Sequence, residues 1–176
     1  MRIFIIFSMV FSFLSGAGSV FASDAIETAG DAVALAAPAT ALVMTLTRSD
    51  REGAFQFLES YAVSSAVTIG LKYTVKERRP NGEKHSFPSF HTSSAFTAAT
   101  FIRNRYGWRY GIPAYLAASF VGWSRIESKE HWTRDVLGGA AIGVASAFIF
   151  TKPYKGAVVT PVVGEHFLGF ALSRRF

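Results

Sequence analysis

Two histidines and one aspartate stand at spacings that favour chemistry. His131 and Asp135 are four residues apart, so on a helix they share one face and the carboxylate can hold the imidazole in one tautomer. An imidazole oriented in this way is a candidate nucleophile. His91 has no carboxylate at a comparable spacing, and it is better placed to protonate a leaving oxygen.

Basic side chains in the same segments could bind the anion on which these histidines act. Lys72, Arg79 and Arg125 supply three cations, and the two guanidinium groups suit bidentate contact with phosphate. Pro88 and Ser89 precede an apolar run, which indicates the start of a helix. Free backbone N–H groups at such an end favour an anion, and the Ser89 hydroxyl can add a donor. The sequence therefore predicts a phosphate site.

Three segments hold these residues at fixed spacings. They read KYTVKERRP from Lys72, PSFH from Pro88 and SRIESKEHWTRD from Ser124. They resemble the three signatures of the type 2 phosphatidic acid phosphatase superfamily, which are K-x6-R-P, P-S-G-H and S-R-x5-H-x3-D. The first and third agree at every fixed position, whereas Phe90 replaces glycine in the second. Ordered signatures of this kind are a specific signal, and the resemblance covers roughly residues 31–150.

The resemblance implies a role for each matching residue. His131 would attack phosphorus and form a phosphohistidine intermediate, Asp135 would orient it, and His91 would act as general acid. Five further residues would bind the phosphoryl oxygens: Lys72, Arg79, Ser89, Phe90 and Arg125. Phe90 would do so through its backbone N–H, in place of the motif glycine. No metal and no cofactor is expected, because the surrounding cations would repel a divalent ion.

The chain around these motifs consists of apolar stretches with little period-two alternation, which is typical of helices. The stretches are 31–47, 54–71, 92–102, 111–123 and 136–151. They predict an all-α helical bundle of the type 2 phosphatidic acid phosphatase kind, embedded in a membrane, with five helices after an N-terminal segment. Each stretch is short for a hydrocarbon core of about 30 Å, so a soluble helical bundle stays open as the alternative.

The length of 176 residues is typical of a single domain. Residues 1–22 have the parts of a secretory signal peptide, but a first transmembrane helix is also open. The resemblance implies that residues 23–155 form the phosphatidic acid phosphatase type 2-like domain. Residues 156–176 are a C-terminal tail that could form a short hairpin.

The amino-acid composition limits the class of protein and the partners that it can bind. Half of the residues are hydrophobic, 17% are charged and none is cysteine, which excludes a disordered chain and a disulfide scaffold. The net charge of +6 does not indicate nucleic-acid binding, because the basic residues lie between long apolar runs. The predicted partners are a phosphorylated lipid or another phosphoester substrate and the membrane, with no nucleic acid and no obligate protein partner.

The connectors that carry Arg48, Arg103 and Lys152 are basic and would lie on the cytoplasmic side if the helices span a bilayer. The motif-bearing segments would then face the other compartment. The predicted location is a bacterial-type inner membrane with the site facing the periplasm, and a soluble periplasmic protein is the alternative.

The leading functional hypothesis is a metal-independent phosphatase for a phosphomonoester or pyrophosphate, with membrane lipids as the first substrates to consider. A soluble periplasmic non-specific acid phosphatase is one alternative. A catalytically inactive phospholipid-binding membrane protein is another, and Phe90 in the second motif favours it.

Overall fold

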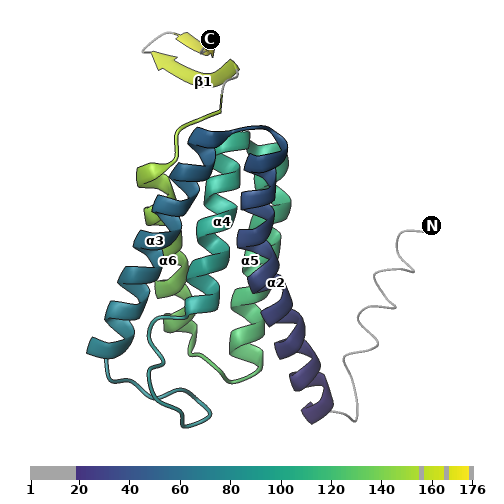
Figure 1. Cartoon of the computed structure of the whole chain (residues 1–176), viewed down its shortest axis with the longest axis vertical. Helices are drawn as coiled ribbons and strands as arrows, with labels where there is room; N and C mark the ends of the chain where they lie inside the picture. Colours follow the sequence, from purple (N-terminus) through teal and green to yellow (C-terminus); the bar gives the residue numbers. More distant parts are fainter. Residues whose placement is uncertain (1–18, 155–156, 165–166, 175–176) are drawn as a thin grey trace, which may run out of the picture.

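The computed structural model describes residues 19–154, 157–164 and 167–174, and the side chains of residues 23–154. Its helical part consists of α2 (Ser19–Thr47), α3 (Arg51–Thr74), α4 (Phe90–Tyr106), α5 (Trp108–Glu127) and α6 (Thr133–Phe150). The helices stand side by side (Figure 1), and α4 packs against each of the other four. The predicted all-α bundle of five helices is therefore confirmed for the described residues.

The helices extend beyond the apolar stretches because capping groups set their ends. The Asp50 carboxylate caps α3 by accepting from the Gly53 backbone N–H at 2.9 Å, and Ser89 stands at the N-cap of α4. Gly107 separates α4 from α5 with a φ of +88°, which residues with a side chain rarely adopt.

The first described helix starts earlier than the apolar pattern predicted. α2 begins at Ser19, so the predicted start at residue 31 is wrong, because the polar residues before it continue the helix. Of the predicted signal peptide or first transmembrane helix at residues 1–22, residues 1–18 lie outside the described part of the chain. Residues 19–22 belong to α2.

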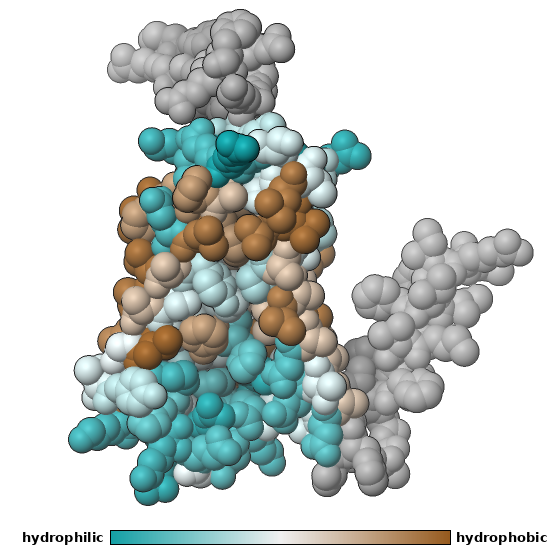
Figure 2. Space-filling model, viewed as in Figure 1, coloured by the Kyte–Doolittle hydropathy of each residue, from teal (hydrophilic) through white to brown (hydrophobic). Residues whose placement is uncertain are grey.

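The bundle encloses apolar clusters, one of them around Phe57 and Phe101, together with many buried hydroxyl groups, and it is apolar outside. Its buried positions are rich in Ala, Ser and Thr, and hydroxyl groups bond between helices, as from Thr97 Oγ1 to Ser64 Oγ at 2.9 Å. Large apolar side chains point outward, with Leu35 76% and Ile149 74% exposed. Figure 2 shows this surface as a brown band between hydrophilic ends. The segments Ser23–Thr47 and Thr133–Phe150 are long and apolar enough to cross a membrane.

Close approach of α4 and α6 depends on glycines in α6. A Cβ atom added at Gly139 would collide with the backbone oxygen of Ser89, and one added at Gly143 would collide with that of Ser93. The N-terminal half of α4 therefore lies directly on the backbone of α6.

The opposite end of the bundle contains a buried ion pair that joins three connectors. Arg105 Nε donates to Asp50 Oδ2 at 2.8 Å, and Arg105 Nη1 donates to the Lys152 carbonyl at 2.9 Å. The backbone N–H of Tyr154 donates to the Arg105 carbonyl at 2.9 Å. The three basic connectors thus meet at one end, but Arg105 itself is neutralised by Asp50 and is not a free surface charge.

Beyond this end, the C-terminal tail has two antiparallel strands, β1 (Ala157–Gly164) and β2 (Phe167–Arg174). Ala157 lies opposite Arg174 and Gly164 lies opposite Phe167. The hairpin lies at the far end of the molecule from the polar loops between α3 and α4 and between α5 and α6 (Figure 1).

Candidate active site

All three motif segments converge at one end of the bundle, where α3 and α5 end and α4 and α6 begin. The backbone N–H of Ser89 donates to the Asp135 carbonyl at 3.0 Å, which joins the second motif to the third. Lys72 Nζ, in the last turn of α3, donates to the His85 carbonyl at 2.7 Å. This bond joins the first motif to the loop that leads into the second.

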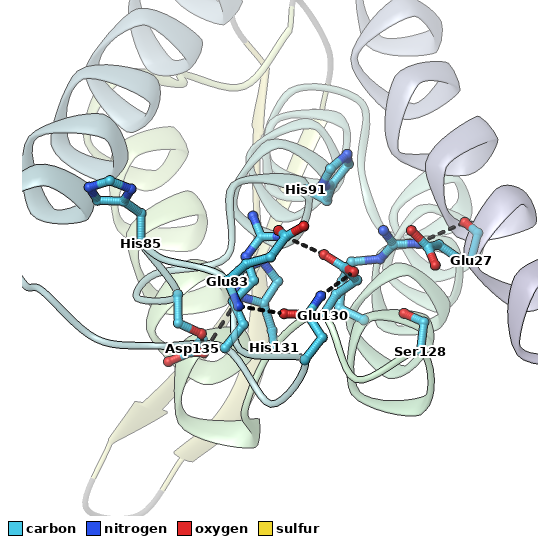
Figure 3. A network of polar contacts seen from close by, with 12 residues as sticks. Glu27, Glu83, His85, His91, Ser128, Glu130, His131 and Asp135 are labelled. Atoms are coloured by element: carbon cyan, nitrogen blue, oxygen red, sulfur yellow. Dashed lines mark hydrogen bonds and ion pairs between the residues drawn. The ribbon is translucent and has the colours of Figure 1, made fainter.

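His131 and Asp135 form the buried centre of this end (Figure 3). His131 Nδ1 lies 3.5 Å from Asp135 Oδ2, and the two side chains are 3% and 0% exposed. Nδ1 has no hydrogen-bond partner among the described residues, so this contact is electrostatic. Because Nδ1 faces the carboxylate, Nε2 on the other side of the ring is left for a reaction partner.

The Asp135 carboxylate is itself held by two donors. The backbone N–H of Trp132 donates to Oδ2 at 2.9 Å, and the buried Ser86 hydroxyl donates to the same oxygen. These bonds fix the carboxylate in a position where it can orient the His131 ring. Sequence reasoning missed Ser86, because nothing in its own segment distinguishes it from an ordinary loop serine.

His131 is neutral over a wide pH range. Burial, together with the positive charges of Lys72 and Arg79, lowers the pKa of His131 to about 4, against the opposing effect of Asp135. A neutral imidazole is the nucleophilic form. The same cations that would bind a phosphate thus also keep this ring unprotonated.

The two arginines of the predicted phosphate site are each paired with a carboxylate. Arg79 Nη1 contacts Glu83 at 2.9 Å and also contacts Glu130. Arg125 Nη1 donates to Asp31 Oδ1 at 2.7 Å. Both guanidinium groups are therefore oriented by neighbouring acids. Glu130 had a weak signal in the sequence, since it immediately precedes His131, whereas Asp31 had none.

Ser89 and Phe90 form the start of α4. Ser89 is buried and its Oγ accepts from the Thr92 backbone N–H at 3.4 Å, so the hydroxyl serves as a helix cap. Phe90 is half-buried and its φ is not positive. The backbone there does not require glycine, and Phe90 can present its N–H as glycine would.

His91 lies one residue further along α4, at the same end (Figure 3). Its side chain is 45% exposed, and its Nε2 lies 3.4 Å from Asp31 Oδ1. His91 has no carboxylate nearby in the sequence, but the fold brings it one. The partner comes from α2, too far away in sequence for any spacing rule to reveal.

Fold and motifs together place the chain in one family. The model of the PAP2 superfamily matches residues 53–157, which is more than half of the chain. The chain belongs to the PAP2 superfamily, the type 2 phosphatidic acid phosphatases whose motifs the sequence resembled. This membership supports the predicted phosphatase activity.

Individual relatives of this chain are named as lipid phosphatases. The chain is similar to the lipid A 1-phosphatase of Porphyromonas gingivalis, with 41% identity over 97 residues. That match covers 51% of this chain but only 22% of the relative. The lipid A 4'-phosphatase of Helicobacter pylori is 27% identical over 140 residues, which cover 72% of this chain and 71% of that protein.

One further relative and one solved structure are also similar to this chain. The undecaprenyl-diphosphatase BcrC of Bacillus subtilis is 34% identical over 84 residues, which cover 47% of this chain and 42% of that protein. The crystal structure of LpxE from Aquifex aeolicus superimposes with a TM-score of 0.61 at 24% identity. This superposition covers 70% of this chain and 83% of that one, and it shows a shared fold.

Proposed function

We propose that this chain is a membrane-embedded phosphatase that hydrolyses a phosphomonoester or pyrophosphate of a lipid through a phosphohistidine on His131, without a metal. The observation that carries the proposal is the buried pair of His131 and Asp135, with Lys72 and Arg79 acting electrostatically on the ring. The catalytic domain in this proposal comprises residues 23–155.

The first chemical step forms a bond between His131 Nε2 and phosphorus. As this bond forms, the bond from phosphorus to the leaving oxygen breaks, and its electron pair goes to that oxygen. His91 gives its proton to the leaving oxygen. Asp135 stabilises the proton on His131 Nδ1 while positive charge develops on the ring.

The second step returns the enzyme to its starting state. Water attacks the phosphohistidine, His91 accepts a proton from that water, and the bond between phosphorus and His131 breaks. Positive charges stabilise the equatorial oxygens in both steps. In this proposal the cations are Lys72, Arg79 and Arg125, and the helix start at Ser89 and Phe90 adds backbone N–H donors.

The outward apolar band supports insertion in a membrane. A soluble bundle would bury Leu35 and Ile149, which here are mostly exposed, whereas lipid would cover them favourably. The site lies at one hydrophilic end and the basic connectors lie at the other. With those connectors in the cytoplasm, in keeping with the positive-inside rule, the site faces the periplasm. The motif-bearing segments are basic too, but in this proposal Lys72, Arg79 and Arg125 have another role, which is to bind the substrate phosphate.

The names of the relatives support lipid phosphates as the substrate class, in particular the 1- or 4'-phosphate of lipid A and undecaprenyl diphosphate. The test is phosphate release by the purified, detergent-solubilised chain from lipid A, undecaprenyl diphosphate and phosphatidic acid, each with EDTA present. We expect turnover of at least one lipid, loss of that turnover in His131→Ala, and no effect of EDTA.

Three outcomes would contradict this proposal. Activity that EDTA abolishes would contradict metal independence. Turnover of small soluble esters alone, together with release from membranes by carbonate, would favour the soluble acid phosphatase. No hydrolysis of any substrate by a folded chain would favour an inactive phospholipid-binding protein.

A further inference from the structure

One carboxylate outside the three motifs touches two of their residues. Asp31 Oδ1 lies 2.7 Å from Arg125 Nη1 and 3.4 Å from His91 Nε2. A single oxygen thus lies between a guanidinium group of α5 and an imidazole of α4. Asp31 comes from α2, whose residues precede the segment 53–157 that the PAP2 superfamily model matches.

The backbone of α2 fixes this oxygen in place. Arg125 Nη2 donates to the Glu27 carbonyl at 2.7 Å, one turn before Asp31. A Cβ atom added at Gly30 would collide with Ser124 Oγ, so α2 lies directly against the end of α5 there. The position of Asp31 is therefore set by helix packing rather than by a flexible loop.

We propose that Asp31 is a positioning residue of the active site, whose carboxylate favours the proton that His91 gives to the leaving oxygen. This proposal rests on the proposed function, because it assigns a partner to the acid of that reaction. It makes α2 a part of the catalytic machinery as well as a packing element.

The charges around His91 show why a carboxylate is needed. Burial lowers the pKa of His91, and the positive charges of Arg125 on α5, Arg79 in the loop between α3 and α4, and Lys72 on α3 lower it as well. Each of these charges disfavours a proton on the imidazole. Asp31 on α2 supplies the opposing negative charge. Without Asp31, the pKa of His91 would be lower still, and a smaller fraction of the enzyme would hold the proton that the leaving oxygen needs.

The experiment replaces Asp31 by Asn, which keeps the size of the side chain and removes its charge. The matched control is Asp24→Asn, because Asp24 is an exposed carboxylate on the same helix. Both variants and the unmodified chain are assayed from pH 5 to 9 with a short-chain phosphatidic acid, whose leaving group is an alkoxide. They are also assayed with p-nitrophenyl phosphate, whose aryl leaving group needs little protonation.

We expect Asp31→Asn to lower kcat for phosphatidic acid by about 10- to 100-fold, as loss of support for a general acid should. For the aryl ester we expect a change of less than about threefold. The basic limb of the phosphatidic acid profile should move to lower pH by about one unit. Asp24→Asn should match the unmodified chain in all three measurements.

The ratio of the two rates makes the result independent of folding, since both rates scale with the amount of folded enzyme. Asp31→Glu provides a second variant. Because it retains the negative charge, the basic limb of its pH profile with phosphatidic acid should lie close to that of the unmodified chain. An equal loss on both substrates with an unshifted profile would overturn the proposal and leave Asp31 a structural role only.

Failure of this proposal can be distinguished from failure of the proposed function. If the unmodified chain hydrolyses lipid phosphates in a His131-dependent way while Asp31→Asn behaves as Asp24→Asn, only the role of Asp31 is refuted. If His131→Ala retains full activity, the proposed mechanism itself is refuted.

Discussion

At the scale of single residues, the proposed mechanism gives two chemically identical side chains different roles. His131 is buried and faces Asp135 through Nδ1, whereas His91 is half-exposed and faces Asp31 through Nε2. Burial lowers the pKa of both imidazoles, and the exposed carboxylate of Asp31 opposes this effect at His91. In this proposal the environment, rather than the residue type, distinguishes the nucleophile from the acid.

Ser86 tests how far the orientation of Asp135 matters. Ser86→Ala removes the hydroxyl that donates to Asp135 Oδ2 and leaves the Trp132 backbone as donor. A hydrogen bond to a charged group contributes about 1.5–3 kcal/mol, so we expect kcat to fall about tenfold with KM little changed. The control is Ser60→Ala, a buried serine whose hydroxyl bonds to the carbonyl of Gln56 within α3. Equal effects of the two variants on kcat would contradict a role of Ser86 at the site.

The pH dependence tests the neutral state of His131. Because the attacking ring must be unprotonated, a pKa of about 4 extends phosphoenzyme formation to acid pH, and the rate should fall only as pH approaches that value. Lys72→Met removes a positive charge that lowers this pKa, so it should move the acid limb to higher pH. Quenched-flow measurement of the rate of phosphoenzyme formation at saturating substrate gives the acid limb of this pH profile. The control is Lys76→Met, since Lys76 is exposed, and a limb that stays in place in Lys72→Met would contradict the electrostatic account.

Spacing rules identified the residues of the motifs but not their partners. Side chains four residues apart on one helical turn, such as His131 and Asp135, can be paired from sequence alone. Asp31 and Ser86 reach the site through contacts between different elements, which no local pattern encodes. Their recognition required the packing of α2 on α5 and the path of the loop before α4.

At the scale of helices, the position of the α4 N-terminus decides the site, because Ser89, Phe90 and His91 all belong to it. That terminus lies against α6 at Gly139. Periodicity and hydropathy predicted the existence and order of the helices. They did not predict the helix ends, because caps such as Asp50 and Ser89 and the turn at Gly107 depend on local hydrogen bonds and backbone angles rather than on hydropathy.

Gly139→Ala should therefore disturb both stability and activity. The added methyl group would collide with the Ser89 carbonyl, and such overpacking costs about 1–3 kcal/mol. We expect a lower Tm and a reduced kcat, since the start of α4 must shift. The control is Gly70→Ala on α3, where an added Cβ meets nothing within 4 Å and alanine should stabilise the helix by up to about 1 kcal/mol. A Gly139→Ala variant as stable and active as Gly70→Ala would refute this dependence.

At the scale of the whole molecule, the bundle has two hydrophilic ends with different tasks. One end carries the three motifs of the proposed active site, and the other holds the connectors together through Arg105 and Asp50. The composition predicted the apolar surface. The sequence could not show that Arg105 is neutralised, because its partner lies on the connector between two other helices.

Cysteine labelling tests the arrangement of these ends across a membrane. The chain has no cysteine of its own, so a single introduced thiol gives a clean signal. Lys84 near the site and Arg109 at the other end are both exposed. In intact spheroplasts we expect Lys84→Cys to react with an impermeant maleimide and Arg109→Cys to react only after lysis. The reverse pattern would contradict a periplasmic site, and labelling of both without lysis would contradict a membrane-spanning bundle.

The central claim is that phosphorus is transferred to His131, and trapping the intermediate tests it most directly. The chain is mixed with a substrate labelled with 32P at the transferred phosphate, quenched with alkali because phosphohistidine is acid-labile, and mapped by mass spectrometry. The account predicts a phosphate on His131, none in His131→Ala, and an accumulated phosphoenzyme in His91→Ala with an aryl phosphate, because the water of the second step then lacks its base. A phosphate trapped on any other residue, or turnover retained in His131→Ala, would contradict it.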